Sequence, residues 1–200
     1  MRSDRILEIA RYAGGTITSA ELVEAGARWE DLYRLRDSGQ LLELSRGVYR
    51  VADAPASAHL DLIAVCRRAP GGMICLNSAA SFWDLTDEVP DTVHLAMPRG
   101  GHRPHITHPP TTVHLFAADT FDLGRIQRPV ESGELITISS PERTVVDMMR
   151  LRSRVGRDQA LAALRAYLRR SDAGPGDLLA IARQLRIGRV MADAMEPLLS

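Results

Sequence analysis

The first fifty residues carry the pattern that most restricts the fold of this chain: three short helices followed by a hairpin. Apolar side chains recur at helical spacing over residues 4–12, and two glycines stop that run. Residues 18–21, Thr-Ser-Ala-Glu, have the form of a capping box and predict a short second helix that ends at Gly26. Residues 28–38 predict a third helix, with leucines on one face and polar side chains on the other.

The period of the pattern changes after Gly39. Residues 42–44 and 48–51 favour strands, and Ser45-Arg46-Gly47 between them predicts a tight turn in which the glycine supplies the backbone freedom. Three helices and a hairpin in this order are typical of a winged helix-turn-helix, a DNA-binding module. The same order also fits a helical unit that only packs on its neighbour. The glycine joint at residue 26 favours the DNA-binding interpretation, because it lets the third helix enter a major groove.

The rest of the chain predicts a second domain of mixed structure. An aperiodic, Pro-containing stretch at residues 53–57 marks a boundary, so we expect a winged-helix domain at 1–53 and a second domain at 58–200. The patterns predict further elements: helices at 59–68 and 78–85, strands at 92–97, 112–116 and 135–138, and helices at 141–151, 158–170 and beyond 176. The expected fold class is α+β, an N-terminal winged helix-turn-helix followed by a mixed α+β domain that ends in a helical segment.

Charge is the main argument against nucleic-acid binding. The formal net charge is zero, and residues 1–50 hold eight arginines and eight acidic residues. Every basic residue is arginine, whose planar guanidinium suits phosphate or guanine. A net-neutral module must concentrate its positive charge locally if it is to hold DNA.

The candidate DNA contacts lie at the start of the third helix and in the turn of the hairpin. Arg28 and Arg34 can contact phosphate or guanine, and Tyr33 can donate a hydrogen bond to phosphate. Arg46 is placed to meet a flanking phosphate or the minor groove. Trp29 belongs to the same set, although it fits a core anchor of the helix equally well.

A second cationic surface is predicted near the C-terminus, where residues 141–200 hold eleven arginines and seven acidic residues. Amphipathic helices there can serve as a contact for nucleic acid or for an acidic partner, and the simple alternative is a solvated helix face. The arginines of this surface are Arg165, Arg169, Arg170, Arg183 and Arg186.

The sequence gives little support to a metal or catalytic site. His102, His105 and His108 recur in a Pro-rich loop, but without helical register or an accompanying carboxylate, so we expect no metal there. The acidic residues from Asp84 to Asp91 fit a solvated loop. A metal-dependent nuclease is a weak alternative, and a chain without lysine has no P-loop. We expect no cofactor.

Composition also indicates the cellular compartment of the protein and whether it contacts a membrane. No stretch approaches eighteen uninterrupted apolar residues, so no membrane contact is expected and the chain fits a cytoplasmic protein. Cys66 and Cys75 are too few for a disulfide framework, and both are expected to be reduced and buried.

Taken together, these motifs resemble the AbiEi antitoxin family of bacterial (type IV) toxin–antitoxin systems. The N-terminal resemblance rests on residues 15–22, Leu32-Tyr33-Arg34-Leu35, Gly39-Gln40-Leu41 and Arg46-Gly47-Val48-Tyr49. Downstream it rests on residues 77–80, 83–85, 94–98 and 140–147, so it covers most of the chain.

The resemblance implies a non-enzymatic protein with two roles. The winged helix would repress its own operon by binding double-stranded operator DNA. Operators of this family are usually inverted repeats, which implies that a homodimer binds them. The C-terminal region would neutralise a nucleotidyltransferase-like toxin, through direct contact or functionally. The family's recognition-helix positions correspond to Arg28–Arg34 and its wing arginine to Arg46. A stand-alone transcriptional regulator remains the alternative.

Overall fold

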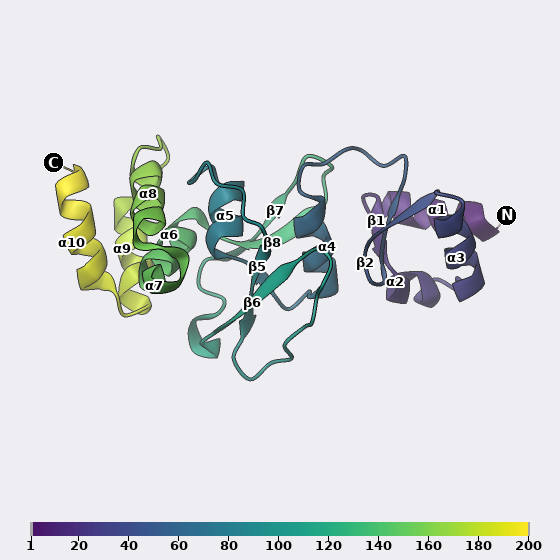
Figure 1. Ribbon diagram of the computed structural model, residues 1–200, viewed down its shortest axis with the longest axis horizontal. Coiled ribbons are helices and arrows are strands. Elements are labelled where there is room, and N and C mark those ends of the chain that lie inside the picture. Colours follow the sequence, from purple (N-terminus) through teal and green to yellow (C-terminus); the bar gives the residue numbers. More distant parts are fainter. Residues whose placement is uncertain (1, 200) are drawn as a thin grey trace. The chain divides into compact units, whose positions relative to one another are not determined.

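The computed structural model describes residues 2–199 and divides into two compact units. The first unit comprises the chain up to Gly71 together with Pro104–Thr111 and Gln127–Ile136. The second comprises Gly72–Arg103, Thr112–Ile126 and the chain from Thr137 onwards. The mixed fold confirms the predicted α+β class (Figure 1). No helix within residues 2–199 is long and apolar enough to cross a membrane.

The N-terminal part of the first unit is a winged helix. Its elements are α1 (Arg2–Tyr12), β1 (Thr16–Thr18), α2 (Ser19–Glu24), α3 (Trp29–Asp37), β2 (Leu41–Ser45) and β3 (Val48–Val51). The three strands form one antiparallel sheet in the order β1-β3-β2. The three helices and the hairpin confirm the prediction. Strand β1 was not predicted, because three residues are too few to show a period.

Local sequence signals account for the ends of these helices. The Thr18 hydroxyl accepts a hydrogen bond from the Glu21 amide at 3.2 Å, and the Thr18 amide donates to the Glu21 carboxylate at 2.7 Å. This is the predicted capping box at the start of α2. Gly47 has a φ of 75°, so the wing turn uses the left-handed backbone that glycine adopts without strain.

The core of the winged helix takes one face of each helix and the inner face of the small sheet. Its buried members are Ile6, Leu7, Ala10, Ile17, Leu22, Leu32, Leu35, Leu41, Tyr49 and Val51. Leu32 and Leu35 fix the inward side of α3, as the amphipathic pattern predicted. The opposite side of α3 is left exposed.

The first unit also includes segments beyond residues 53–57, because two features attach these later segments to the wing. Helix α4 (Leu60–Arg68) packs on β1, β2 and β3. Arg50 of β3 is 3% exposed, and its guanidinium donates to the Thr16 hydroxyl at 2.8 Å and to the Glu134 carboxylate at 2.5 Å. The Pro55 carbonyl accepts a third hydrogen bond from Arg50. Whether residues 1–53 and 58–200 fold separately stays a prediction.

After α4 the chain forms a five-stranded sheet in the order β6-β5-β4-β8-β7. Most of its residues belong to the second unit, whereas Thr111, residues 127–129 and residues 135–136 belong to the first. Strand β4 pairs antiparallel with β5 and parallel with β8. The elements of this part of the chain are β4 (Met73–Ile74), α5 (Leu76–Phe82), β5 (Val93–Pro98), β6 (Thr111–Phe116), a 3-10 turn (Ala118–Thr120), β7 (Arg125–Pro129) and β8 (Leu135–Ser139). Strands β4 and β7 were not predicted. Strand β4 has only two residues, and β7 (Arg-Ile-Gln-Arg-Pro) lacks a clear apolar face.

The second unit ends in helices, as predicted. These are α6 (Pro141–Arg150), α7 (Arg152–Val155), α8 (Arg157–Leu168), α9 (Pro175–Gln184) and α10 (Gly188–Leu199). Ser140 caps α6 by accepting from the Arg143 amide at 3.2 Å, and Pro141 occupies the first turn. Of the two cysteines, Cys75 is buried as expected, but Cys66 on α4 is only half-buried because its side of the helix is not fully covered.

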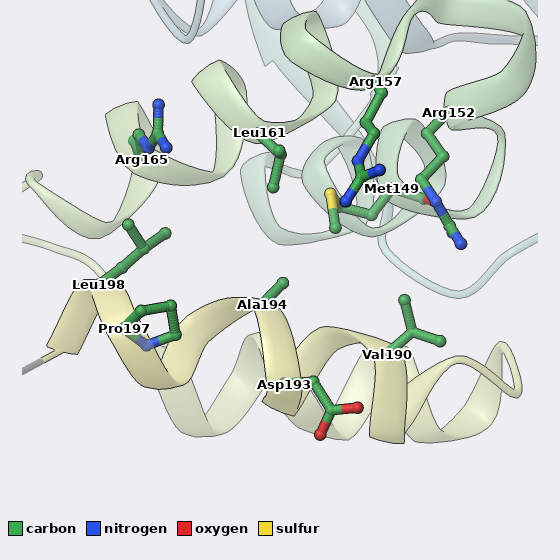
Figure 2. Close-up of a pocket in the computed structure, with 10 residues that line it drawn as sticks. All are labelled: Met149, Arg152, Arg157, Leu161, Arg165, Val190, Asp193, Ala194, Pro197 and Leu198. Carbon is green, nitrogen blue, oxygen red and sulfur yellow. The ribbon is translucent and has the colours of Figure 1, made fainter.

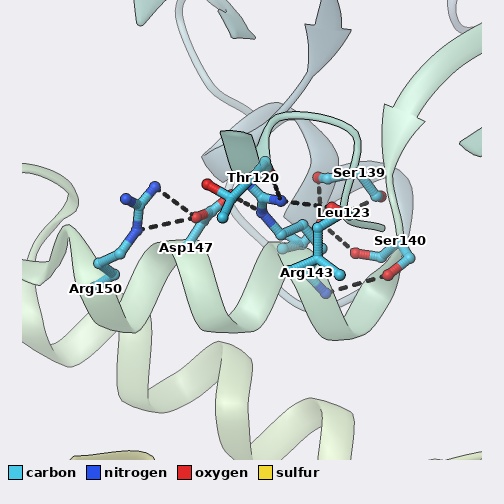
Figure 3. Close-up of polar contacts among 8 residues, drawn as sticks. Thr120, Leu123, Ser139, Ser140, Arg143, Asp147 and Arg150 are labelled. Atoms are coloured by element: carbon cyan, nitrogen blue, oxygen red, sulfur yellow. Dashed lines mark hydrogen bonds and ion pairs between the residues drawn. The ribbon is translucent and has the colours of Figure 1, made fainter. Parts of the chain in front are cut away.

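A buried ionic network holds α6 in place (Figure 3). The fully buried Arg143 donates to the Asp147 carboxylate at 2.6 Å and to the Thr120 carbonyl at 2.8 Å. Arg150 contacts the other oxygen of Asp147 at 2.8 Å. The segment 140–147 is therefore part of the interior, where its charges compensate one another.

Candidate nucleic-acid interface

The outward face of α3 carries two half-exposed aromatic side chains. Trp29 is 49% exposed and Tyr33 is 46% exposed, and neither belongs to the core that Leu32 and Leu35 enter. Trp29 is therefore not a core anchor of the helix, and its role as a contact residue stays a prediction. Large aromatic groups exposed on a short helix favour a contact surface, because hydration of their apolar area is unfavourable.

The aromatic side chains and one arginine form a continuous row along α3. The ring centroids of Trp29 and Tyr33 are 6.4 Å apart, and the Arg36 guanidinium lies 5.1 Å from the centre of the Tyr33 ring. Positions i, i+4 and i+7 place the three side chains on one face of the helix. Arg36 was missing from the predicted site, although its spacing from Tyr33 could have indicated it.

Most of the positive charge on α3 is compensated within the helix or by the wing. Arg34 forms an ion pair with Asp31 at 2.6 Å. Arg36 contacts Asp37 at 2.9 Å and lies 4.0 Å from Glu43 of β2. These pairs explain physically how α3 carries two arginines while the module as a whole stays net-neutral.

Two predicted arginines lack such compensation. Arg28 is exposed and occupies the N-cap position of α3, with no capping hydrogen bond from its side chain. Arg46 is exposed in the wing turn. Across residues 2–199, neither side chain makes an ion pair. The uncompensated charge of the winged helix thus includes the start of α3 and the tip of the wing.

Arg46 also lines a hollow beside the wing that the sequence did not reveal. The hollow has a volume of about 320 Å³. Its lining comes from β2, the wing turn, the end of α4 and the loop 105–108: Glu43, Ser45, Arg46, Arg68, His105, Ile106, Thr107 and His108. The loop with three histidines was expected to be a solvated extended segment. Its three histidines are exposed, and His105 and His108 line the hollow together with Arg46 and Arg68, which no spacing in the sequence could indicate.

A family comparison covers this module. The model of the AbiEi antitoxin transcriptional regulators matches residues 4–52. Residues 4–52 are thus similar to the AbiEi antitoxin family. This matched segment, the AbiEi segment, runs from α1 through β3, so it contains the whole of α3, the wing, and all five predicted contact residues. The resemblance stated from the sequence is thereby confirmed for this part of the chain.

A solved structure resembles most of the chain in fold. The crystal structure of the RV2827C protein from Mycobacterium tuberculosis aligns with a TM-score of 0.59, over 94% of this chain and 75% of that one. The sequences are 18% identical, so the likeness concerns the fold. No curated protein matches the sequence of the chain.

Outside the AbiEi segment, the predicted C-terminal arginines do not form one cluster. Arg170 is held by Asp172 at 2.9 Å and donates to the Trp83 carbonyl at 2.9 Å. Arg169 lies at the end of α8, Arg183 on α9, and Arg186 after α9, all three exposed.

Arg165 of this set lines a groove. The groove has a volume of about 370 Å³ and lies between α10 and the helices α6 to α8 (Figure 2). Its apolar lining is Met149, Leu161, Val190, Ala194, Pro197 and Leu198, and its charged lining is Arg152, Arg157, Arg165 and Asp193. Arg157 and Arg165 make no ion pair within the described chain, residues 2–199. An apolar groove with unpaired arginines can accept an apolar segment that also carries negative charge.

The histidines and acidic residues were also considered as metal ligands. In the part of the chain that the structure describes, no three His, Cys, Asp or Glu side chains are grouped so that they could hold a metal ion. His94 and His114 stack with ring centroids 5.1 Å apart, and their ring nitrogens lie 3.0 Å apart. Burial, with the neighbouring His94, lowers the pKa of His114 to about 4. This pair is therefore neutral near pH 7.

Proposed function

We propose that this protein is a non-enzymatic antitoxin that also represses its own operon through the winged helix. The observation that carries the DNA-binding part is the outward face of α3: half-exposed Trp29 and Tyr33 with the uncompensated Arg28 at its start, in a segment of the AbiEi antitoxin family. In this arrangement α3 enters the major groove, and Arg46 on the wing contacts the flanking backbone.

The division of labour among the contacts follows from the charge pairing. Arg28 can reach guanine or phosphate without breaking an ion pair, whereas Arg34 must first leave Asp31. Trp29 and Tyr33 supply apolar contacts to base edges such as the thymine methyl group, and the Tyr33 hydroxyl can donate to phosphate. The target is double-stranded operator DNA, and inverted repeats would recruit two protomers.

The DNA-binding part is tested on promoter DNA with the full chain. The double variant Arg28→Ala/Arg46→Ala is expected to lose at least tenfold in affinity, since one base contact is worth about 1–3 kcal/mol. Arg5→Ala, which removes an exposed arginine from α1, is the control for the change in net charge. Fluorescence anisotropy at physiological salt measures both. Equal affinity of the double variant and the control would refute the interface.

In the antitoxin role, the second unit binds and neutralises a nucleotidyltransferase-like toxin. The groove between α10 and α6 to α8 supports this assignment, since its apolar lining and its arginines Arg152, Arg157 and Arg165 complement an acidic amphipathic segment of such a toxin. The other predicted arginines then lie outside the groove and contribute only to the positive electrostatic potential of the surface. These are Arg169, Arg170, Arg183 and Arg186.

Growth rescue tests the antitoxin part in cells that express the adjacent toxin gene. Val190→Glu together with Arg165→Glu changes the groove from apolar and cationic to acidic, so rescue should be lost. The matched control is Val89→Glu with Arg99→Glu, two exposed positions away from the groove. Retained rescue by the groove variant would contradict the assignment. If promoter binding persists while no adjacent gene product is neutralised, the protein is a stand-alone regulator.

A further inference from the structure

We propose that the hollow beside the wing binds a phosphate group of the DNA backbone. This inference rests on the proposed DNA-binding function and adds to it a contact site that includes the loop 104–111. The residues that line the hollow include Arg46, Arg68, His105 and His108, together with Ser45 and Thr107. Arginine and histidine side chains that converge on one concave surface offer several N–H donors to one tetrahedral anion.

Arg68 carries the first step of the argument. It is the last residue of α4, which packs on the wing strands. Its Nε atom is shielded from solvent and has no hydrogen-bond partner among residues 2–199. A buried guanidinium N–H without an acceptor is unfavourable by about the cost of a lost charged hydrogen bond, so the site is incomplete in the absence of an acceptor. An oxygen of a phosphate in the hollow would supply that acceptor.

The loop 104–111 carries the second step. Ile106 is 7% exposed and anchors the loop. His105 and His108 line the hollow while remaining exposed to solvent. His102, the third histidine of the repeat, does not line it. The two-residue spacing of the histidines thus presents two of them to one site, next to the arginine in the wing turn.

The third step is the charge of the lining. Glu43 is the one carboxylate among the lining residues. Its oxygens are already engaged, one accepting from the Gly47 amide at 3.3 Å and the other 4.0 Å from Arg36. Arg46 and Arg68 have no ion-pair partner within residues 2–199. The balance of the site is therefore cationic, and its place at the wing suits a phosphate that flanks the groove read by α3.

Variants of the full chain test this inference, with His102→Ala as the matched control. Arg68→Gln and the double variant His105→Ala/His108→Ala should each weaken binding about tenfold, by the same factor on the operator and on an unrelated duplex. Arg68→Gln removes a full positive charge, so it should also reduce the salt dependence by about one phosphate. His102→Ala should change neither quantity. Circular dichroism verifies folding, and the histidine variant keeps the test valid if Arg68→Gln fails to fold. Unchanged binding by both variants overturns the inference.

A second arm identifies the source of the phosphate. Operator duplexes with single methylphosphonate substitutions should abolish the effect of Arg68→Gln at one or two adjacent positions, since the contacted phosphate is then neutral. An effect of equal size at every position overturns the contact. If the wild type binds no duplex at all, the proposed DNA function fails by itself. Titration with inorganic phosphate, followed through the ring resonances of His105 and His108, then tests the hollow separately, and an absence of any shift overturns the site.

Discussion

Removal of Glu134 should destabilise the winged helix although this residue lies far from it in the sequence. Glu134 is the anionic partner of Arg50, and the side chains of the pair are 2% and 4% exposed respectively. In Glu134→Ala the guanidinium keeps only the Thr16 hydroxyl and the Pro55 carbonyl as acceptors. Its charge is then buried without compensation.

The expected size of the effect comes from that burial. Removing one partner of a buried ion pair costs about 3–5 kcal/mol, because the remaining ion stays desolvated. In a chain of this length each kcal/mol lowers the midpoint of thermal unfolding by about 2–4 °C, which corresponds to a decrease of roughly 6–20 °C. Since Arg50 lies on β3 next to the wing turn, affinity for DNA should decrease in parallel.

Glu131→Ala is the matched control. Glu131 lies on the same segment, but it is exposed and contacts the Ser57 hydroxyl at 2.8 Å and the His59 ring at 3.2 Å. Surface pairs of this kind contribute about 0–1 kcal/mol. Urea unfolding followed by tryptophan fluorescence compares the two variants. Equal losses of unfolding free energy in Glu134→Ala and Glu131→Ala would refute the argument.

A double substitution separates the ion pair from packing. Arg50→Leu with Glu134→Leu removes both charges at once and leaves no buried ion behind. The double variant should therefore lose less unfolding free energy than the sum of the two single variants, by an interaction term of about 0.5–3 kcal/mol. Additive losses would show that the two side chains act independently.

Three further perturbations test local features of the fold. Thr18→Ala removes the capping box and should lower the unfolding free energy measured in urea by about 1 kcal/mol. Burial tends to raise the pKa of Glu21, but hydrogen bonds from Thr18 outweigh it and hold this pKa below 4.5. The extra stability of the wild type over Thr18→Ala should therefore vanish as the pH falls through the lowered pKa of Glu21. Burial lowers the pKa of His114 to about 4, whereas an unfolded histidine titrates near 6.5, so stability should decrease from pH 6.5 towards pH 4. His114→Asn should reduce this dependence, to which the lowered pKa of His94 also contributes, whereas His102→Asn should keep it in full. Gly47→Ala places an alanine at a φ of 75°, which is strained for a residue with a side chain, and brings the new methyl group to 2.9 Å from the Ser19 hydroxyl. The free energy of unfolding should therefore decrease by more than about 1 kcal/mol.

Local signals in the sequence predicted most of the winged helix. The capping box at Thr18 and Glu21 set the start of α2, and Gly47 set the wing turn, because each acts through neighbours within a few residues. The leucines of α3 gave its buried face. Strand β1 escaped prediction, since its only distinguishing property is its pairing with β3.

The parts that sequence reasoning missed depend on contacts between distant segments. Arg50 and Glu134 are separated by 84 positions, and nothing in either neighbourhood indicates the other. The meeting of Arg46, Arg68 and His105 is equally non-local. The packing of α4 on the wing strands is a contact of the same kind, because the sequence around α4 gives no sign of it.

The ion pairs on α3 also bear on how a repressor finds one site among all the sequences of a genome. Arg34 and Arg36 are matched to Asp31 and Asp37, so the helix offers little net charge to duplexes that do not fit it. Non-specific sites compete through phosphate attraction alone, and their number makes that competition severe. A recognition helix that is nearly neutral would therefore spend less time on the wrong DNA, and its selectivity would come from the fit of Trp29 and Tyr33 to the bases.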